Sequence, residues 1–296
     1  MRVAVIDIGS NSIRLGVTDS DGRELARDVT VTGLGSGIER TGSFDLGAYA
    51  ATVSTIARYG SIIDRHAVST IVAVATSASR DAGNGSALMD DIERVLGVRP
   101  TIIDGAYEAA LAFSGATEGL PGGAPKLVID VGGGSTEFVF GTTEPLYTKS
   151  IDMGSVRLTD RCVGERPIRT RTIEIARTEC DAAFASVSLP AIPDLAIGVA
   201  GTFTNLSAIS MHLEAYDRAV VHGSELSVVS AGELVDRLAG LTIEETKAIP
   251  SLDPARAKVI LAGAVVVERA MIRCGLDSIT ISEHDLLDGL AADARG

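Results

Sequence analysis

The sequence predicts an α/β protein made of two similar units with a cleft between them. The first observation is a repeat: residues 5–17 read VIDIGSNSIRLGV and residues 128–140 read VIDVGGGSTEFVF, with Asp, Gly and Ser at matched positions. Each copy begins a run of three strand patterns, which helical patterns and a further strand follow. A stretch rich in Gly and Pro, residues 118–126, separates the two runs. We therefore expect domain I over residues 1–120 and domain II over residues 121–296, with helical insertions in domain II.

The first unit begins with a predicted meander of three strands. Apolar runs predict strands in RVAVIDIG (2–9), SIRLGVTD (12–19) and RELARDVTV (23–31), with an Asp-Gly turn between the last two. Apolar residues at helical spacing then predict a helix over 45–65, and VSTIVAVAT (68–76) predicts a buried strand. A helix over 86–96, a short strand in RPTIID (99–104) and a helix from about Gly105 complete the unit.

The second unit repeats this order. Strands are predicted in KLVIDVGG (126–133), STEFVFG (135–141) and EPLYTKSID (144–152), and helical stretches follow them. LAIGVAG (195–201) predicts a buried strand, and TFTNLSAI (202–209) opens a helix. The stretch DSITISEHDLLDGLA (277–291) predicts a strand and then a helix.

Charge and composition exclude several classes of protein. The formal net charge of −13 argues against a nucleic-acid-binding protein that depends on overall positive potential, although an anionic substrate stays compatible with it. No apolar run reaches membrane-spanning length, and the first residues enter a strand pattern without a charged leader, so we expect a cytoplasmic protein. Three widely spaced cysteines favour neither a disulfide framework nor a zinc site.

The repeated turn has the composition of a phosphate-binding site. Small residues after a strand let backbone N–H groups point into the turn and approach an anion closely. Such a turn is more often only structural, but its duplication favours two facing turns that clamp a phosphate chain. The residues concerned are Ser10, Asn11 and Ser12 in the first copy and Gly132, Gly133, Gly134 and Ser135 in the second. Asp7 and Asp130, at the strand ends, are candidate ligands of a divalent cation.

The paired turns resemble those of the actin-like ATPase superfamily. Further stretches resemble one branch of it, the exopolyphosphatase / guanosine pentaphosphate phosphohydrolase (Ppx/GppA) family. They are ATSASRDAGN (75–84), DGAYEAALAFSGA (104–116), DMGSVRLTD (152–160), GVAGTFTNLSAI (198–209) and SEHDLLDGLA (282–291). The resemblance covers essentially the whole chain. It implies two ribonuclease H-like (actin-like) domains with the active site in the cleft between them.

The resemblance also implies a reaction, the hydrolysis of a terminal phosphoryl group. The substrate would be linear polyphosphate or the 5′ end of guanosine pentaphosphate, and nothing in the sequence reads guanine. A water must be placed in line with the phosphorus, and charge on the phosphoryl oxygens must be neutralised. The family's pattern assigns these roles to Glu108 as general base, Glu137 as a second acid, Arg14 and Arg80 as phosphate contacts, and Gly201 and Thr202 as a phosphate-contacting turn. It further implies Mg²⁺ or Mn²⁺ as cofactor and a homodimer.

One departure from the family's pattern concerns the catalytic helix. The family often reads Gly-x-Glu-Glu-Ala-Arg there, whereas here Gly105 is followed by Ala-Tyr-Glu-Ala-Ala, so the neighbouring acid and arginine are absent. Glu108 still matches, but its local network differs.

Two questions stay open at this point. Arg157, Arg161, Arg166, Arg169 and Arg171 either extend the anion path for a long polymer or form a solvated surface, partly offset by Asp160 and Glu165. The alternatives to a phosphohydrolase are an actin-like kinase and a non-catalytic polyphosphate or nucleotide sensor. Glu108 argues against the sensor, and the match across several motifs argues against the kinase.

Overall fold

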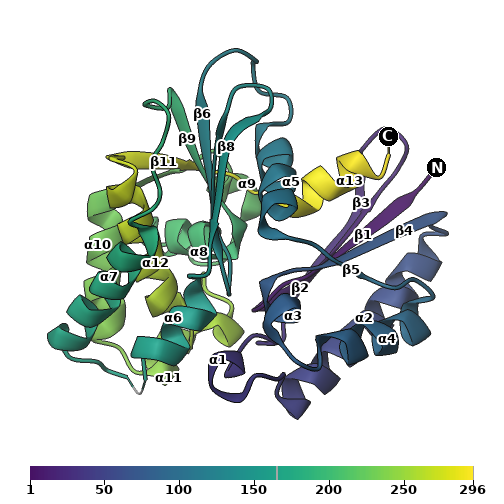
Figure 1. Cartoon of the computed structure of the whole chain (residues 1–296), viewed down its shortest axis with the longest axis horizontal. Coiled ribbons are helices and arrows are strands. Elements are labelled where there is room, and N and C mark those ends of the chain that lie inside the picture. Colours follow the sequence, from purple (N-terminus) through teal and green to yellow (C-terminus); the bar gives the residue numbers. More distant parts are fainter. Residues whose placement is uncertain (165, 296) are drawn as a thin grey trace.

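The first unit is built on a five-stranded sheet, sheet A, with strand order β3-β2-β1-β4-β5. The computed structural model describes residues 1–164 and 166–295 (Figure 1). In sheet A, β1, β2 and β3 form an antiparallel meander, and β4 and β5 continue it in parallel with β1. The strands are β1 (Val3–Ile8), β2 (Ser12–Thr18), β3 (Glu24–Val31), β4 (Thr70–Ala75) and β5 (Thr101–Ile102). The helices are α1 (Ile38–Thr41), α2 (Leu46–Arg65), α3 (Ser77–Asp81) and α4 (Gly85–Leu96).

The second unit repeats the arrangement in a six-stranded sheet, sheet B, with strand order β10-β11-β9-β6-β7-β8. Again an antiparallel meander, β6-β7-β8, is extended by parallel strands, β9 and β11. The strands are β6 (Lys126–Val131), β7 (Thr136–Gly141), β8 (Pro145–Ile151), β9 (Leu195–Val199), β10 (Glu225–Ser227) and β11 (Ser278–Ile281). The helices are α6 (Ser155–Cys162), α7 (Thr170–Phe184), α8 (Ala200–Ser210), α9 (Arg218–Val221), α10 (Val228–Ala239), α11 (Ile243–Lys247) and α12 (Ile260–Arg273), with a 3₁₀ turn at Pro254–Arg256.

This topology confirms the predicted fold class. Both sheets order a three-stranded antiparallel meander and then parallel strands reached through helices, which is the arrangement of two ribonuclease H-like (actin-like) domains. The predicted strands and helices form close to their expected limits. Three short elements were not predicted, α1, α3 and β10, because three to five residues carry too little periodicity to be recognised.

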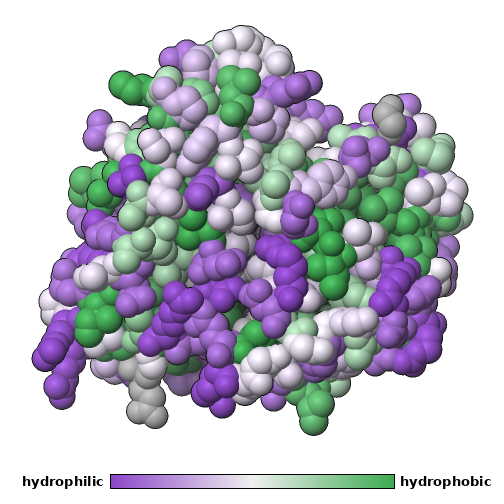
Figure 2. Space-filling model, in the orientation of Figure 1, coloured by the Kyte–Doolittle hydropathy of each residue, from purple (hydrophilic) through white to green (hydrophobic). Residues whose placement is uncertain are grey.

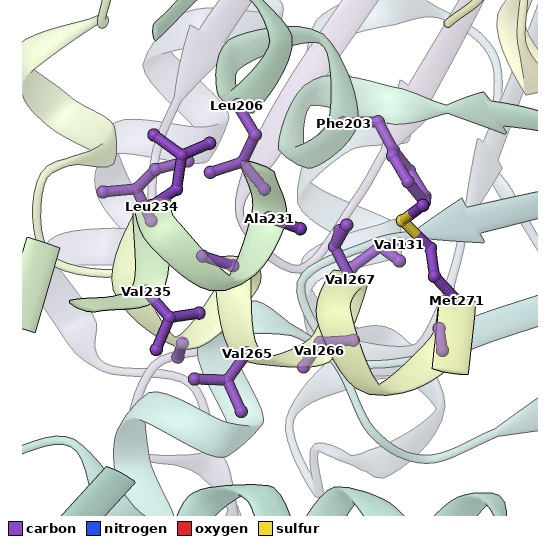
Figure 3. Packing of buried hydrophobic residues seen from close by; sticks show 14 of the residues in the cluster. Val131, Phe203, Leu206, Ala231, Leu234, Val235, Val265, Val266, Val267 and Met271 are labelled. Atoms are coloured by element: carbon purple, nitrogen blue, oxygen red, sulfur yellow. The ribbon is translucent and has the colours of Figure 1, made fainter. Parts of the chain in front are cut away.

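The larger hydrophobic core lies between sheet B and α12. Val265, Val266 and Val267 point in different directions from α12, yet all three are fully buried. A helix that is apolar all round must be enclosed by other elements. Figure 3 shows α12 packed between Leu234 and Val235 on one side and the sheet on the other. Among the described residues, no helix combines the length and the hydrophobicity that crossing a lipid bilayer requires.

Two helices join the units. α5 (Gly105–Thr117) leaves sheet A, and α13 (Leu286–Asp293) follows the last strand of sheet B. The two helices lie against each other between the sheets (Figure 1), and α13 also contacts β1 and β2. Glycines permit this close crossing, since a Cβ at Gly115 would lie 2.0 Å from the carbonyl oxygen of Asp285 and one at Gly289 would lie 2.1 Å from that of Leu111.

Candidate active site

A cleft of about 480 Å³ lies between the two units. The carboxyl ends of β1 and β6 and the first turns of α5 and α8 all open onto it, since Asp7, Glu108, Asp130 and Thr202 line its wall. Ligands of open α/β sheets bind outside the carboxyl ends of the strands, where helix N-termini also present free N–H groups. The cleft therefore has the position of a binding site for an anion.

The two repeated turns have the same internal geometry. The N–H of Gly9 donates to the carbonyl oxygen of Ser12 at 3.0 Å, and the N–H of Gly132 donates to that of Ser135 at 3.1 Å. The turns also meet: a Cβ at Gly134 would lie 2.2 Å from Ser77 Oγ and 2.7 Å from Ser10 Oγ. Glycine is therefore needed at position 134 for the two units to approach each other this closely.

All seven residues that the sequence predicted for the turns lie at the cleft. They are Ser10, Asn11, Ser12, Gly132, Gly133, Gly134 and Ser135.

Glu108 lies in the first turn of α5, which begins at Gly105. The helix starts there because Asp104 caps it, accepting the N–H of Tyr107 at 2.8 Å. The Glu108 carboxyl is buried, and its Oε2 accepts a hydrogen bond from Arg80 Nη1 at 3.2 Å. Burial raises the pKa of Glu108 to about 8, because the charges of Asp130 and Asp7 add to it while Arg80 only partly opposes it. A carboxyl with this pKa can exchange protons near neutral pH.

Asp7 and Asp130 stand at the ends of β1 and β6 and are both buried. Burial raises the pKa of Asp7 against the effect of Arg14, and it raises that of Asp130 to about 7. Oδ1 of Asp7 is buried without a hydrogen-bond partner among the described residues. Two desolvated carboxylates with an unpaired oxygen facing a cleft are suitable ligands for a hard divalent cation. No group of three metal-binding side chains occurs in the described part of the chain, so substrate oxygens and water would have to complete the coordination.

Arg14 lies between two carboxylates in the cleft wall. Its Nε donates to Asp7 Oδ2 at 2.8 Å, and its Nη1 pairs with Asp285 Oδ2. Burial lowers the pKa of Arg14, but Asp285 and Asp7 outweigh this effect and raise it above its usual value. The side chain therefore stays charged, and some of its N–H groups are already hydrogen-bonded to Asp7 and Asp285 where it lines the cleft.

Glu137 and Arg80 lie one layer behind the cleft and are not among the described residues that line it. Glu137 is fully buried beside Asp130 in the β6–β7 pair and accepts Ser150 Oγ–H at 2.8 Å. Burial, with the charges of Glu108 and Asp130, raises the pKa of Glu137 well above its usual value. Arg80 is held by the carbonyl oxygen of Ile103 at 2.5 Å as well as by Glu108. Arg80 thus contacts the candidate base Glu108, and Glu137 lies beside the candidate cation ligand Asp130.

The other end of the cleft contains a residue that sequence reasoning missed, Arg256. A Cβ at Gly201 would lie 2.5 Å from Arg256 Nη1, so glycine there makes room for the guanidinium beside the first turn of α8. Burial lowers the pKa of Arg256, with Asp253 opposing this effect. Gly201 and Thr202 line the cleft as predicted. Arg256 lies four residues before α12, and no motif around it marks it as a cleft residue.

Asp285 and Arg27 were also missed. Asp285 caps α13 by accepting the N–H of Leu287 at 2.9 Å, and its other oxygen pairs with Arg14. Arg27 on β3 donates to both oxygens of Asp288 at 3.0 Å. The capping pattern of Asp285 and Asp288 was visible in the sequence as a helix start, but the arginines that they pair with lie more than 250 residues away.

The arginine-rich segment does not lie along one path. Arg157 and Arg161 pair with Glu39, a residue of the first unit. Arg166 is buried and donates to the carbonyl oxygens of Leu238 and Ala257. Of the two acidic residues expected to offset this segment, Asp160 accepts the N–H of Gly37 of the first unit at 2.6 Å, and Glu165 lies outside the described residues.

The charge in the cleft favours a bound cation. Among the described lining residues, the basic ones are Arg14, Arg27, Arg218 and Arg256, and the acidic ones are Asp7, Glu108, Asp130, Asp253, Glu283 and Asp285. Because acidic groups outnumber basic ones, a polyphosphate would need further positive charge to bind here.

Comparison with known proteins agrees with this geometry. Residues 17–294 match the model of the Ppx/GppA phosphatase family. The chain is 37% identical to exopolyphosphatase 2 of Mycobacterium tuberculosis, with 100% of this chain and 99% of that protein covered. It is 28% identical to exopolyphosphatase 1 of Mycobacterium leprae, covering 98% of this chain and 88% of that protein.

Solved structures give the same result. The crystal structure of an exopolyphosphatase-like protein superposes with a TM-score of 0.93 at 36% identity, covering 100% of this chain and 99% of that one. The Ppx/GppA family member of Aquifex aeolicus superposes with a TM-score of 0.81 at 29% identity, covering 99% of this chain and 97% of that one. The chain therefore belongs to the Ppx/GppA phosphatase family, as its motifs predicted.

Proposed function

We propose that this protein is an exopolyphosphatase, which releases terminal orthophosphate from linear polyphosphate. Family membership makes the chain a phosphoric anhydride hydrolase. The observation that carries the proposal is the position of Glu108, a buried carboxyl whose pKa burial raises to about 8, on the same cleft as two matched glycine- and serine-rich turns. This arrangement suits in-line attack of water on a phosphoryl group held by the turns.

The proposed mechanism gives each side chain one task. The N–H groups and hydroxyls of the two turns hold the terminal phosphoryl oxygens, and Arg256, beside Gly201 in the cleft wall, contacts another part of the phosphate chain. Glu108 accepts a proton from the attacking water, and its raised pKa makes the carboxylate a stronger base than that of an exposed glutamate. Arg80 fixes the orientation of the Glu108 carboxylate through the hydrogen bond at 3.2 Å. Glu137 supports the site from behind Asp130.

The cofactor in this proposal is Mg²⁺ or Mn²⁺. Asp7 and Asp130 would hold the ion, because both are buried, both face the cleft, and Asp7 Oδ1 has no other partner among the described residues. When bound, the cation would neutralise charge on the phosphoryl oxygens and lower the pKa of the nearby carboxyls. A homodimer, which rests on the family resemblance, and a cytoplasmic location, which rests on the expectation from the sequence pattern, also belong to this proposal.

Polyphosphate is the preferred substrate in this proposal because exopolyphosphatase 2 of M. tuberculosis, so named, matches the chain over its whole length. Guanosine pentaphosphate is the alternative within the family. A non-catalytic polyphosphate or nucleotide sensor is the alternative of another class.

Substrate comparison tests the proposal. Phosphate release should be measured with Mg²⁺ at matched concentrations of long polyphosphate, short polyphosphate, guanosine pentaphosphate and ATP. We expect release from polyphosphate to be fastest. Faster release from guanosine pentaphosphate would favour the alternative substrate, and binding of polyphosphate without release of phosphate would favour the sensor.

A further inference from the structure

Helix α6 makes a charged contact between the two units, beside the cleft. Arg157 on α6 donates from Nη1 to Glu39 Oε1 at 2.8 Å and from Nη2 to Asp81 Oδ2 at 2.6 Å. Glu39 lies on α1 and Asp81 ends α3, so both acceptors belong to the first unit. In Figure 1, α6 of the second unit faces α1 and α3 of the first unit, and Figure 2 shows that the surface over them is largely hydrophilic. We call the contact of Arg157 with Glu39 and Asp81 the α6 latch.

Arg157 also holds one of the phosphate turns. Its Nε donates to the carbonyl oxygen of Gly134 at 2.9 Å. One guanidinium thus bonds to the glycine turn of the second unit and to two helices of the first unit. The Arg157 side chain is only 13% exposed, and all three of its nitrogen atoms have partners. A fixed planar group with donors in three directions is suited to this role, which a lysine could not fill.

The latch acts on the site through α3. This short helix ends at Asp81, and the residue before it, Arg80, donates to the candidate base Glu108. At the start of α3, Ser77 Oγ lies 2.9 Å from Ser10 Oγ in the first phosphate turn. The segment that Arg157 holds at one end therefore touches both the general base and a phosphate turn.

We propose that Arg157 is a positioning residue that keeps the cleft closed, with the glycine turn held against the first unit at the distance that phosphoryl transfer requires. The need for this distance rests on the proposed function, whereas the closure itself does not. Arg157 is not a phosphate ligand in this proposal, because it is not among the described residues that line the cleft, and three of its five guanidinium N–H groups are bonded to Gly134, Glu39 and Asp81.

Loss of the latch should change substrate affinity more than the chemical step. Without Arg157 the closed form is a smaller fraction of the free protein. The apparent Kd for substrate equals the Kd of the closed form divided by that fraction, so it rises as the fraction falls. If closure drops to about one tenth, KM rises about 10-fold, while kcat in the closed complex stays within about threefold.

The test compares Arg157→Gln with Arg161→Gln. Arg161 is the matched control, since it also pairs with Glu39 but, in the described part of the chain, does not bond to the glycine turn or to Asp81, and its side chain is 35% exposed. For a distance measurement, spin labels are attached at Ala87→Cys on α4 and Ser186→Cys after α7, with Cys162 and Cys274 replaced by serine. The distance between the labels is measured by electron spin resonance without substrate, so this result does not depend on the proposed function.

We expect Arg157→Gln to lengthen and broaden the distance distribution and to raise KM for polyphosphate about 10-fold. Arg161→Gln should leave the distances unchanged and KM within about twofold. An unchanged distance distribution in a folded Arg157→Gln protein, or an unchanged KM, would overturn the proposal. If Arg157→Gln does not fold, the double variant Glu39→Gln with Asp81→Asn removes the same link and is read in the same way. If the wild type releases no phosphate from any substrate, the proposed function fails, and the label distances still decide whether the latch exists.

Discussion

Replacing Asp130 with asparagine should make the metal-free protein more stable at alkaline pH, although the change alters a candidate cation ligand. Asp130 is 6% exposed, and no cation partner for its carboxylate lies within ion-pair distance among the described residues. Its charge is therefore stabilised only at longer range, by Arg14, while Asp285 and Asp7 act against it.

The magnitude follows from the pKa of Asp130. Burial raises it from 3.8 to about 7. A difference of about 3 pKa units corresponds to about 4 kcal/mol, at 1.36 kcal/mol per unit. Because the folded pKa is raised, this stability is fully present below the unfolded pKa and is lost as the pH rises through about 7. Asparagine carries no charge at any pH, so it avoids a penalty that is about 1.6 kcal/mol at about pH 5 and about 4 kcal/mol at about pH 8. The stability of the variant relative to wild type should therefore be about 2 to 3 kcal/mol more favourable at about pH 8 than at about pH 5.

Urea unfolding in the presence of a chelator measures this difference. Wild type and Asp130→Asn are unfolded at about pH 5 and about pH 8, and the change in the difference between their midpoints is compared. Mg²⁺ should then raise the midpoint of the wild type more than that of the variant, because binding to the native state stabilises it. A variant that is less stable than wild type by the same amount at both pH values would refute the reasoning, since no ionisation penalty would then exist.

Three further changes have expected outcomes. Arg80→Gln should shift the acidic limb of the kcat/KM pH profile to higher pH. Arg80 lowers the pKa of Glu108, so the loss of Arg80 raises that pKa, and pH profiles of kcat/KM measure the shift. Arg256→Gln should raise KM for polyphosphate about 10-fold, since a charge-assisted phosphate contact is lost, as steady-state kinetics would show. Gly115→Ala should lower the free energy of unfolding by at least about 1 to 3 kcal/mol in urea titrations, because its methyl group would lie 2.0 Å from the carbonyl oxygen of Asp285.

Each of these changes has a matched control. Arg80→Lys keeps the charge and should keep most of the pH profile. Arg23→Gln changes an exposed arginine outside the cleft and should leave KM within about twofold. Gly60→Ala adds a methyl group in open space on α2 and should be neutral or stabilising. Equal effects in a variant and its control would contradict the corresponding role.

The fold was largely predictable because its signals are local. The strand patterns around Asp7 and Asp130, the glycines that follow them and the cap at Asp104 each lie within a few residues of what they determine. The duplication of one turn then indicated two related units that face each other. Short elements such as α1 and α3 were missed because they are held by contacts such as Arg157 with Glu39 and not by their own periodicity.

The partners of the site residues could be predicted only in part. Arg14 was expected at the cleft, but its pairing with Asp285 joins positions 271 residues apart and depends on α13 packing against β1 and β2. α13 also packs against α5, and this crossing requires glycine at both Gly115 and Gly289, where sequence alone shows only two small residues on separate helices. Arg256 likewise reaches the cleft because Gly201 leaves room for it.

The most direct test of the account is phosphate release from polyphosphate with Mg²⁺ by the wild type, Glu108→Gln and Glu118→Gln. Glu118 is the matched control, an exposed glutamate at the other end of α5. Because a general base contributes on the order of 10²- to 10⁴-fold, Glu108→Gln should lose at least about 100-fold in kcat and still bind polyphosphate, while Glu118→Gln should match the wild type. A folded Glu108→Gln protein that releases phosphate at the wild-type rate would contradict the assignment of Glu108 as the base and with it the proposed mechanism.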